Sequence, residues 1–445
     1  MKKKMIILGG GESGVGAALL AKQKGYDVFL SDAGSLKEIY RNELNNEGIE
    51  WEEGGHDEER ILSADEIMKS PGIPEKNELV KKIRRKGIPV ISEIELAYRY
   101  AGDSKIIAIT GSNGKTTTTS LIYHIMKTGG IDAALVGNIG ESFAKQVALD
   151  PKPVYVVEVS SFQLDDIVSF RPNIAVLTNI TEDHLDRYDY KFENYIKSKF
   201  RITENQQQGD YFIFNEDDEV TMNFINQFNI HSNQLPISMA HENKTAFIKD
   251  GDMYVRTGED FMTMSVEDFI LKGRHNQYNT MAACVAGVTM EIRKEKIREA
   301  VQTFQNLEHR MEHVAFIRGV EFINDSKATN INSTWYALES MTKPTILILG
   351  GLDKGNDYSL LNELMDQKVK TIVCLGVDNS RIHEAFDGKV AKIFDTASAS
   401  EAVQVAFNNA EKGDVVLLSP ACASFDLFKN YEDRGVQFKK AVIDL

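Results

Sequence analysis

The chain has 445 residues, a length that predicts about three domains, each large enough to bury its own core. Hydrophobic residues make up 42% and charged residues 26% of the sequence, which excludes a largely disordered chain, a collagen-like chain and a disulfide scaffold. The 51 basic and 66 acidic residues leave a net charge of −15, which repels polyanions and argues against nonspecific nucleic-acid binding.

The cysteines and the N-terminal segment indicate a cytoplasmic protein. Cys284, Cys374 and Cys422 are widely spaced and form no CxxC pair, as expected of buried thiols in a reducing compartment. The apolar run Met5–Leu8 stops at Gly9, short of the roughly 7–15 residues of a signal-peptide core. No later stretch reaches the ~20 apolar residues that cross a bilayer, so we expect no membrane partner.

Short apolar runs alternate with helical or polar stretches along the chain. This pattern is typical of parallel strands joined by crossover helices, so the predicted class is α/β. The predicted strands are Met5–Leu8, Val28–Leu30, Ile106–Ile109, Val154–Val159, Ile174–Leu177, Ile346–Leu349, Ile372–Leu375 and Val415–Leu418.

Polar breaks before residues 105 and 320 place domain boundaries near 94 and 306. The predicted domains are therefore 1–93, 94–306 and 307–445. Within the second domain, Asp250-Gly251 lies between two apolar runs and predicts a hairpin with a type I′ turn over 246–255.

The first candidate site is a glycine-rich loop directly after the first predicted strand. Gly9, Gly11 and Gly14 satisfy GxGxxG, which directs backbone N–H groups at a phosphate. Asp32 ends the next strand, where dinucleotide-binding proteins carry a ribose-binding acid. On this segment alone, a nicotinamide dehydrogenase, another diphosphate-nucleotide site and a turn without a ligand all stay open.

The second candidate is a phosphate-binding loop after the strand that begins at Ile106. Its glycines allow successive N–H groups to surround an anion, Lys115 neutralises phosphate charge, and the Thr116 hydroxyl can bind Mg²⁺. The loop departs from GxxxxGK[ST], because Ile109 stands where the first glycine is expected. A hydride transfer does not need ATP, so this second loop favours a ligase over a dehydrogenase. The predicted ATP-binding residues here are Gly111, Ser112, Asn113, Gly114, Lys115, Thr116 and Thr117.

Further motifs extend over most of the chain. These are Glu158-Val-Ser-Ser-Phe-Gln-Leu164, Thr178-Asn-Ile-Thr-Glu-Asp-His-Leu-Asp-Arg187, Asn324-Asp-Ser-Lys-Ala-Thr-Asn330 and the segment 418–435. With the phosphate-binding loop they make the sequence closely similar to the Mur ligases. The Glu158 segment and segment 418–435 most resemble the members that add D-glutamate.

The resemblance implies three domains: a Rossmann-like UDP-binding domain, a P-loop ATPase-type central domain and a Rossmann-like C-terminal domain. It implies an amide ligase that uses ATP to phosphorylate the carboxylate of UDP-N-acetylmuramoyl-L-alanine, after which the amine of D-glutamate displaces phosphate. This step belongs to cytoplasmic peptidoglycan synthesis, hence to cell wall biogenesis, cell shape and cell division. We expect a monomer that closes around its substrates and has no nucleic-acid partner.

The resemblance also implies the catalytic residues, which are Lys115, Glu158, His184 and Lys199. Two Mg²⁺ ions, replaceable by Mn²⁺, are expected on Thr116, Glu158, His184 and Lys199, the last as an N6-carboxylysine. Carbamylation needs a neutral amine, whereas an ordinary lysine has a pKa near about 10.4. A plain surface lysine stays open as an alternative, and Lys197 is a nearby competitor.

The remaining site residues are likewise carried by the resemblance. The adenine, ribose and phosphates of ATP are expected at Asn276, Asn279, Arg310, Asp325 and Lys327. D-glutamate is expected at Thr329, Lys354, Ser424 and Tyr431, and the UDP-sugar at Ser13, Gly14, Asp32, Gly72 and Asn138.

Two other functional interpretations of the same motifs remain open. A neighbouring Mur ligase or a folylpolyglutamate-type ligase would share the ATP loop, but the motif in 418–435 argues against both. A P-loop binding or regulatory protein without catalysis would not need Glu158, His184 and Lys199 together.

Overall fold

The computed structural model describes residues 2–305, 308–353 and 355–445, and the chain divides into two compact units. Unit 1 consists of the chain up to Ile270 together with Tyr278–Phe304, and unit 2 of Leu271–Gln277 together with the chain from Gln305 to Leu445. The two units contain three sheets, which confirms the predicted α/β class with three sheet-containing domains. The boundaries at 94 and 306 stay predictions. None of the helices in the described parts of the chain is both long enough and apolar enough to cross a membrane.

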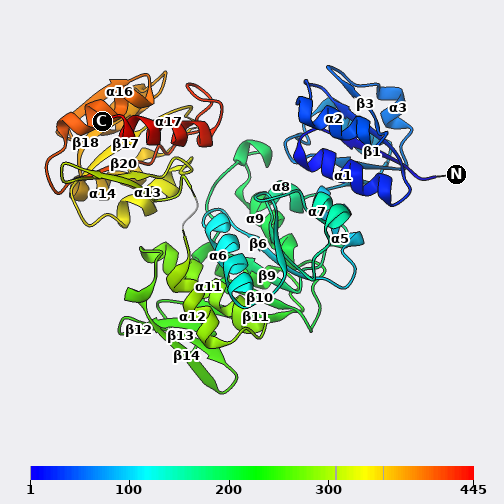
Figure 1. The fold of residues 1–445 in the computed structure, drawn as a ribbon, viewed down its shortest axis with the longest axis horizontal. Coiled ribbons are helices and arrows are strands. Elements are labelled where there is room, and N and C mark those ends of the chain that lie inside the picture. Colours follow the sequence, from blue (N-terminus) through cyan, green and yellow to red (C-terminus); the bar gives the residue numbers. More distant parts are fainter. Residues whose placement is uncertain (1, 306–307, 354) are drawn as a thin grey trace. The chain divides into compact units, whose positions relative to one another are not determined.

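The first sheet of unit 1 has five parallel strands in the order β3-β2-β1-β4-β5. Figure 1 labels β1 and β3 of this sheet. Its strands are β1 (Lys4–Leu8), β2 (Asp27–Asp32), β3 (Glu50–Glu53), β4 (Glu66–Lys69) and β5 (Val90–Ile91). The helices of this region are α1 (Glu12–Gln23), α2 (Glu38–Asn46), α3 (Glu58–Leu62), α4 (Glu78–Arg85) and α5 (Glu93–Tyr100).

Both faces of this sheet are buried, which explains why its strands are apolar at successive positions. Met5 and Ile7 belong to a core with residues of α1 and α2, whereas Ile6 and Leu8 belong to a second core with residues of α3 and α4. Side chains alternate between faces along a strand, so a continuous apolar run fills two cores at once.

The second sheet of unit 1 has nine strands in the order β14-β13-β12-β11-β10-β9-β6-β8-β7. The strands are β6 (Lys105–Thr110), β7 (Ala133–Gly137), β8 (Val154–Glu158), β9 (Ile174–Leu177), β10 (Tyr211–Asn215), β11 (Asn233–Ser238), β12 (Ala246–Lys249), β13 (Asp252–Thr257) and β14 (Asp260–Ser265). The helical segments are α6 (Lys115–Thr128), α7 (Phe143–Leu149), α8 (Ser161–Leu164), η1 (Leu185–Arg187), α9 (Phe192–Phe200), η2 (Arg201–Thr203), α10 (Glu219–Phe224), η3 (Ile225–Gln227), η4 (Val266–Asp268), α11 (Arg274–Thr289), which both units share, and α12 (Lys294–Thr303).

The predicted hairpin is confirmed at one edge of this sheet. Strands β12 and β13 pair in antiparallel fashion. Asp250 and Gly251 between them have φ angles of 51° and 85°, and positive φ at both central residues is what a type I′ turn requires.

Unit 2 contains a six-stranded sheet in the order β15-β16-β20-β17-β18-β19, parallel except for the β15–β16 pair. Its strands are β15 (Glu312–Ile317), β16 (Val320–Asn324), β17 (Thr345–Leu349), β18 (Val369–Leu375), β19 (Lys392–Thr396) and β20 (Val415–Leu418). The helical segments are α13 (Ile331–Glu339), η5 (Tyr358–Leu361), α14 (Asn362–Lys368), α15 (Ser380–Phe386), α16 (Ala399–Asn409) and α17 (Tyr431–Ile443).

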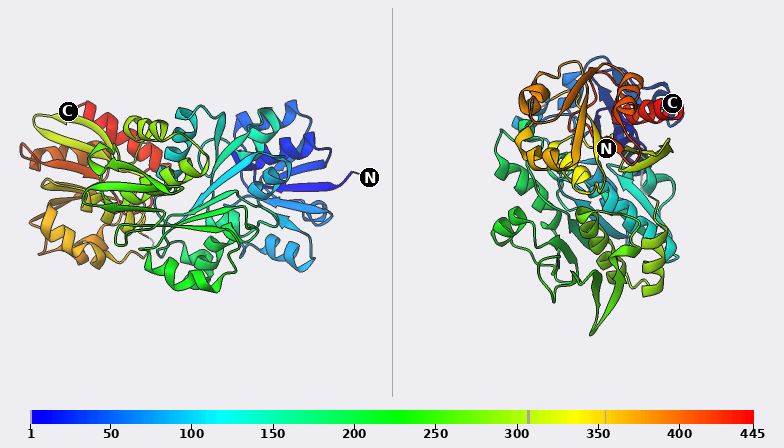
Figure 2. Two further views of the ribbon diagram at one scale, coloured as in Figure 1. Left: turned by 90° about the horizontal axis from the view of Figure 1, so that it is seen from below. Right: turned by 90° about the vertical axis from the view of Figure 1, so that its left-hand side faces the viewer.

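Helices cover both faces of this sheet too. Figure 1 shows α16 and α17 on one side and α13 and α14 on the other. Leu347 and Cys374 are buried with residues of α13, α14 and α15, whereas Ile348 and Leu375 are buried with residues of α16 and α17. Figure 2 shows helices flanking the sheets from two further directions.

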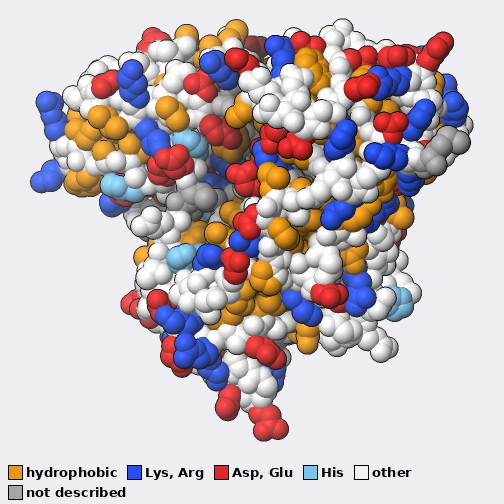
Figure 3. Space-filling model, turned by 45° about the vertical axis from the view of Figure 1, so that its right-hand side comes forward, with side chains coloured by type: hydrophobic (Ala, Val, Ile, Leu, Met, Phe, Trp, Pro, Cys, Tyr) orange, Lys and Arg blue, Asp and Glu red, His pale blue; other side chains and the backbone are white. Residues whose placement is uncertain are grey.

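All eight predicted strands are present, and their observed ends differ from the predicted ends by at most about three residues. Strands β15 and β19 are among those that were not predicted; both lie at sheet edges and carry exposed polar positions instead of an apolar run. The three cysteines are free and buried, as predicted. On the face in Figure 3, acidic and basic side chains are interspersed.

Candidate active site

The predicted phosphate-binding loop lies between β6 and the N-terminus of α6 in unit 1. Gly114 caps this helix with a φ of 81°, and a Cβ there would lie 2.5 Å from Oδ1 of Asn279, so a side chain would be both strained and crowded. The Nζ of Lys115 donates to the carbonyl oxygens of Gly111 (2.7 Å) and Ser112 (2.8 Å). Thr116 is buried in the first turn of α6.

A second segment, after β9, fixes the shape of this loop. The hydroxyl of Thr178 donates to the carbonyl of Asn113 (2.6 Å), and Oδ1 of Asn179 accepts from the Asn113 N–H (3.0 Å). The hydroxyl of Ser112 donates to the carbonyl of Thr181 (2.8 Å). Thr178, Asn179 and Thr181 belong to the motif 178–187 but had no predicted role, because a hydrogen bond between loops leaves no periodic signal in the sequence.

Glu158 is a buried carboxylate beside the phosphate-binding loop. It ends β8, where it is the register partner of Ile109 in β6, and it is 1% exposed. Its Oε1 accepts from Nδ2 of Asn138 (2.8 Å), while its buried Oε2 finds no hydrogen-bond partner among the described residues. A buried carboxylate oxygen without a partner is costly, and a cation would satisfy it. This oxygen therefore fits a Mg²⁺ ligand.

His184 lies in the loop after β9 and is held by an aromatic ring. It has a φ of 53°, and its ring meets that of Phe162 edge to face at 5.1 Å between centroids. The guanidinium of Arg187 lies 4.2 Å from the centre of the same ring and donates to the carbonyl of Pro71 (3.0 Å). Phe162, another residue without a predicted role, thus orients two residues of the His184 loop.

Lys199 is buried, which contradicts the alternative of a plain surface lysine. It is 1% exposed on α9, whereas Lys197 is exposed on the same helix. Its Nζ donates to the carbonyl of Gly111 (2.7 Å) and lies 5.0 Å from the ring centre of Tyr195. Burial, reinforced by the nearby charge of Lys115, holds the pKa of Lys199 well below its usual value. A neutral amine is the form that carbamylation requires.

The glycine-rich loop after β1 is built differently. A Cβ on Gly14 would lie 1.8 Å from the carbonyl oxygen of Gly9, so only glycine allows α1 to start this close to the strand. The carboxylate of Asp32 accepts from the N–H groups of Gly10 and Gly34. Ser13 is half-buried in the first turn of α1, and Gly72 is exposed after β4.

In unit 2, predicted site residues gather where β16 and β20 end. Asp325 follows β16, and its carboxylate accepts from the Ser419 hydroxyl (3.0 Å) and the Met311 N–H (3.2 Å). Burial raises the pKa of Asp325 to about 7, against the opposing charge of Arg310. The Nζ of Lys327 lies 5.4 Å from the ring centre of Tyr431.

The other residues predicted to bind D-glutamate or ATP differ in burial and in the unit to which they belong. Ser424 is buried and Thr329 is exposed, while Lys354 lies outside the described residues. On α11, Asn279 belongs to unit 1 and accepts from the Thr118 hydroxyl (3.1 Å), whereas Asn276 belongs to unit 2 and donates to the Lys272 carbonyl (2.8 Å).

Arg434 is a further residue of unit 2 that sequence analysis missed. It is fully buried on α17, and its guanidinium donates to the Ser326 carbonyl (2.8 Å) and the Cys422 carbonyl (3.2 Å). It therefore ties together the two segments that carry Asp325 and Ser424. Its place in the quoted segment 418–435 was the only signal.

Three family models match successive parts of the chain. The MurD N-terminal domain matches residues 4–79, the Mur ligase middle domain residues 109–287, and the Mur ligase glutamate ligase domain residues 309–422. The first of these matches covers the Gly9–Gly14 loop, so the dehydrogenase alternative is not supported.

Curated relatives match from end to end. The chain is 53% identical over 446 residues to the "UDP-N-acetylmuramoylalanine--D-glutamate ligase" of Christiangramia forsetii, with 100% of both chains covered. It is 52% identical over 445 residues to the protein of the same name from Bacteroides fragilis, again with 100% coverage of both.

Solved structures share the fold at low sequence identity. A pseudomurein peptide ligase type C from Methanothermus fervidus superposes with a TM-score of 0.64 at 21% identity over 100% of both chains. The MurF ligase from Thermotoga maritima, solved in complex with ADP, gives a TM-score of 0.60 at 13% identity over 94% of this chain and 95% of that one.

Proposed function

This chain belongs to the Mur ligase family, and we propose that it joins D-glutamate to UDP-N-acetylmuramoyl-L-alanine with ATP, by way of an acyl phosphate. The reaction is a step of peptidoglycan precursor synthesis, so its loss affects cell wall, cell shape and cell division. We place it in the cytoplasm and expect the enzyme to act as a monomer. The name shared by full-length relatives at 52–53% identity supports this choice within the family.

The observation that carries the proposal is the meeting of two lysines at one carbonyl of the phosphate-binding loop. Lys115 and Lys199 both donate to the carbonyl oxygen of Gly111 at 2.7 Å. One amine comes from the start of α6 and the other from buried α9. A binding loop without catalysis has no need of a second, desolvated amine at this point.

The chemistry needs negative charges to be brought together. The substrate carboxylate attacks the γ-phosphorus of ATP and ADP leaves; the D-glutamate amine then attacks the acyl carbon, phosphate leaves and the amine loses a proton to solvent. The loop N–H groups and Lys115 hold the phosphates and offset the charge that develops on them. The loop and the substrate domains orient the two reacting groups, which lowers the entropic cost.

Thr116, Glu158, His184 and Lys199 as N6-carboxylysine are the residues that would hold two Mg²⁺ ions. The buried Oε2 of Glu158 supports this assignment, and the low pKa of Lys199 favours the carbamate. Bound Mg²⁺ supplies neutralisation of phosphate charge, and Mn²⁺ should replace it because histidine is among the proposed ligands.

We propose that each predicted domain brings one substrate. Domain 1–93 holds the UDP-sugar through Ser13, Gly14, Asp32 and Gly72, with Asn138 from domain 94–306. Domain 94–306 holds ATP on residues 111–117 and Asn279. Domain 307–445 holds D-glutamate through Thr329, Lys354, Ser424 and Tyr431. It also contributes Arg310, Asp325 and Lys327 toward ATP, which Asn276 of domain 94–306 contacts as well.

The test is phosphate release by the purified chain with ATP, Mg²⁺ and UDP-N-acetylmuramoyl-L-alanine, comparing D-glutamate, L-glutamate, L-alanine and meso-diaminopimelate. We expect release only with D-glutamate and the UDP-sugar together, with a product heavier by one glutamyl residue in mass spectrometry. Release with another amino acid would replace D-glutamate by that acceptor. No release with any acceptor would support the non-catalytic alternative.

A further inference from the structure

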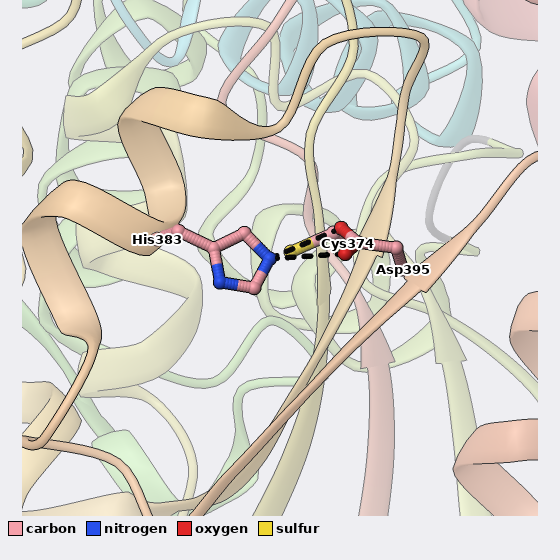
Figure 4. Close-up of side chains that lie close together, drawn as sticks. All are labelled: Cys374, His383 and Asp395. Atoms are coloured by element: carbon pink, nitrogen blue, oxygen red, sulfur yellow. Dashed lines mark hydrogen bonds and ion pairs between the residues drawn. The ribbon is translucent and has the colours of Figure 1, made fainter.

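Three side chains that could bind a metal ion come together in unit 2, and none of them is among the residues proposed for the ligase site. Cys374 in β18 and Asp395 in β19 are register partners on neighbouring parallel strands, so their side chains point to the same face of the sheet. His383 on α15 lies in the connection between these strands. Figure 4 shows the thiol, the imidazole and the carboxylate converging, and one ligand atom of each lies within 4.8 Å of the others.

The distances between the ligand atoms suit a small cation after a modest movement of the side chains. Nε2 of His383 lies 3.2 and 3.1 Å from the two carboxylate oxygens of Asp395. Ligand atoms at about 2.0–2.2 Å from a tetrahedral zinc ion are separated by roughly 3.3 Å. Cys374 is buried in the core of unit 2, yet its sulfur lies within 4.8 Å of the ligand atoms of His383 and Asp395.

Neighbouring groups hold the histidine and the carboxylate in the orientation that a metal site needs. Nδ1 of His383 lies 3.2 Å from Oδ1 of Asp387, and a hydrogen bond there leaves Nε2 to serve as the ligand. Nδ2 of Asn379 donates to Oδ1 of Asp395 (2.9 Å). Metal-bound histidines almost always have such a carboxylate or carbonyl behind them.

An ion can reach this group from solvent. A cavity of about 410 Å³ is lined by residues that precede α15, lie on it or follow it in the chain, including Asn379, His383, Asp395 and Glu401. The side chain of Asp395 is 58% exposed, whereas Cys374 is fully buried. An ion would therefore enter on the side of Asp395 and His383, which line the cavity, reach the buried thiol behind them and keep one position open to water.

We propose that Cys374, His383 and Asp395 bind a divalent cation of the zinc class, with water as the fourth ligand. One sulfur, one nitrogen and one oxygen ligand select a softer ion than Mg²⁺, which prefers oxygen alone. Binding replaces the S–H bond of Cys374 by a sulfur–metal bond and releases that proton to solvent, with no change in oxidation state. The ion links β18, α15 and β19, so it stabilises this edge of unit 2.

Co²⁺ tests the proposal, because a cobalt–thiolate bond gives a charge-transfer absorption in the near ultraviolet that nitrogen and oxygen ligands do not give. The full-length chain, without a histidine tag, is stripped with a chelator and titrated with Co²⁺ in excess Mg²⁺. We expect one Co²⁺ per chain, the thiolate band, loss of the band when Zn²⁺ is added, and a higher melting temperature with Zn²⁺.

The other buried cysteines provide matched controls. Cys374→Ser should abolish the thiolate band, whereas Cys284→Ser and Cys422→Ser should keep it. Asp395→Asn, at an exposed carboxylate, should weaken Co²⁺ binding at least tenfold and remains informative if Cys374→Ser does not fold.

Two results would overturn the proposal: a wild-type chain without the thiolate band, or a band that survives in folded Cys374→Ser. Weak cobalt absorption without the thiolate band would leave His383 and Asp395 as a surface ion pair only. No readout depends on ligase activity, so this outcome is separate from that of the proposed function.

Discussion

Two glycine-rich loops of unit 1 each follow a strand of their sheet and precede a helix, but different side chains hold them in place. The Gly9–Gly14 loop follows β1 and is held by the carboxylate of Asp32, which accepts from Gly10. The loop that begins at Gly111 follows β6 and is held by the amines of Lys115 and Lys199. Both loops present helix N-termini, which attract anions.

The comparison shows that the glycine pattern locates an anion site, while the surrounding side chains determine its chemistry. A loop closed by a carboxylate suits a nucleotide that is only bound, through N–H groups and hydroxyls. A loop lined by Lys115, by the buried Lys199 with its lowered pKa and by the buried acid Glu158 suits phosphoryl transfer, in which the charge that develops on the phosphates must be offset. Four predictions test this contrast, from the largest effect to the smallest.

Removing the Lys199 side chain, which we propose to be carbamylated, should abolish most of the ligase activity. Lys199→Ala should lower kcat on the order of 10²–10³-fold, because a fixed group beside the reacting phosphate is lost. Phosphate-release kinetics measure the effect, and short carboxylates should restore part of the activity by replacing the carbamate. Lys197→Ala, exposed on the same helix, is the control and should retain full activity. An active Lys199→Ala enzyme would remove Lys199 from the site.

The contact between α5 and the start of α7 should make the stability of the chain depend on pH, because Glu93 of α5 is buried there. Its Oε1 accepts from the Ser142 hydroxyl (2.7 Å) and the Ala144 N–H (2.6 Å), and burial raises its pKa from 4.5 to about 7. The folded chain therefore binds more protons than the unfolded chain between these pH values, so this group's contribution to stability falls as pH rises from 4.5 to 7.

Glu93→Gln should consequently be more stable than wild type at pH 8, by about 3 kcal/mol, and equally stable near pH 4. Urea unfolding at both pH values measures the difference. Glu95→Gln, two residues later on α5, is the opposite control: hydrogen bonds from Ser169 and neighbouring N–H groups lower the pKa of Glu95 despite its burial, so this variant should lose stability at pH 8. Equal curves for Glu93→Gln and wild type would contradict the raised pKa.

Because α1 starts close to the end of β1, Gly14 should tolerate substitution less well than Gly11 in the same loop. Gly14→Ala should destabilise the chain by roughly 1–3 kcal/mol, since its Cβ would meet the Gly9 carbonyl at 1.8 Å. Gly11→Ala is the matched control, because a Cβ there has no atom within 4 Å. Thermal and urea unfolding compare the two variants, and equal losses would refute the packing argument.

The smallest effect is expected at Asp32. Asp32→Asn keeps one acceptor oxygen but loses the negative charge that accepts from the N–H groups of Gly10 and Gly34. We expect this to weaken binding of the UDP-sugar by about 1.5 kcal/mol. The KM for the UDP-sugar should rise about tenfold while the KM for ATP stays unchanged. Asp27→Asn, exposed at the other end of β2, should alter neither constant. A rise in the KM for ATP alone would reverse the assignment of the two loops.

Sequence periodicity predicted the architecture well, because a strand buried on two faces must be apolar at successive positions. Val154–Glu158 and Ile346–Leu349 are such strands. Edge strand β19 was missed, since only its last residue is buried. The β15–β16 pair was missed in part, because β15 alternates exposed and half-buried residues.

The sequence by itself determined the α/β class, the two anion loops and the motifs that mark the family, because glycine, lysine and apolar spacing are local constraints on the backbone. Only the tertiary structure decided that Lys199 and not Lys197 is buried, that Glu158 keeps an oxygen without a partner, and that Cys374, His383 and Asp395 meet. The physical reason is that burial and charge depend on residues far away in the chain. Lys199 loses its proton readily because β6, α6 and α9 fold around it, and no spacing along α9 contains that information.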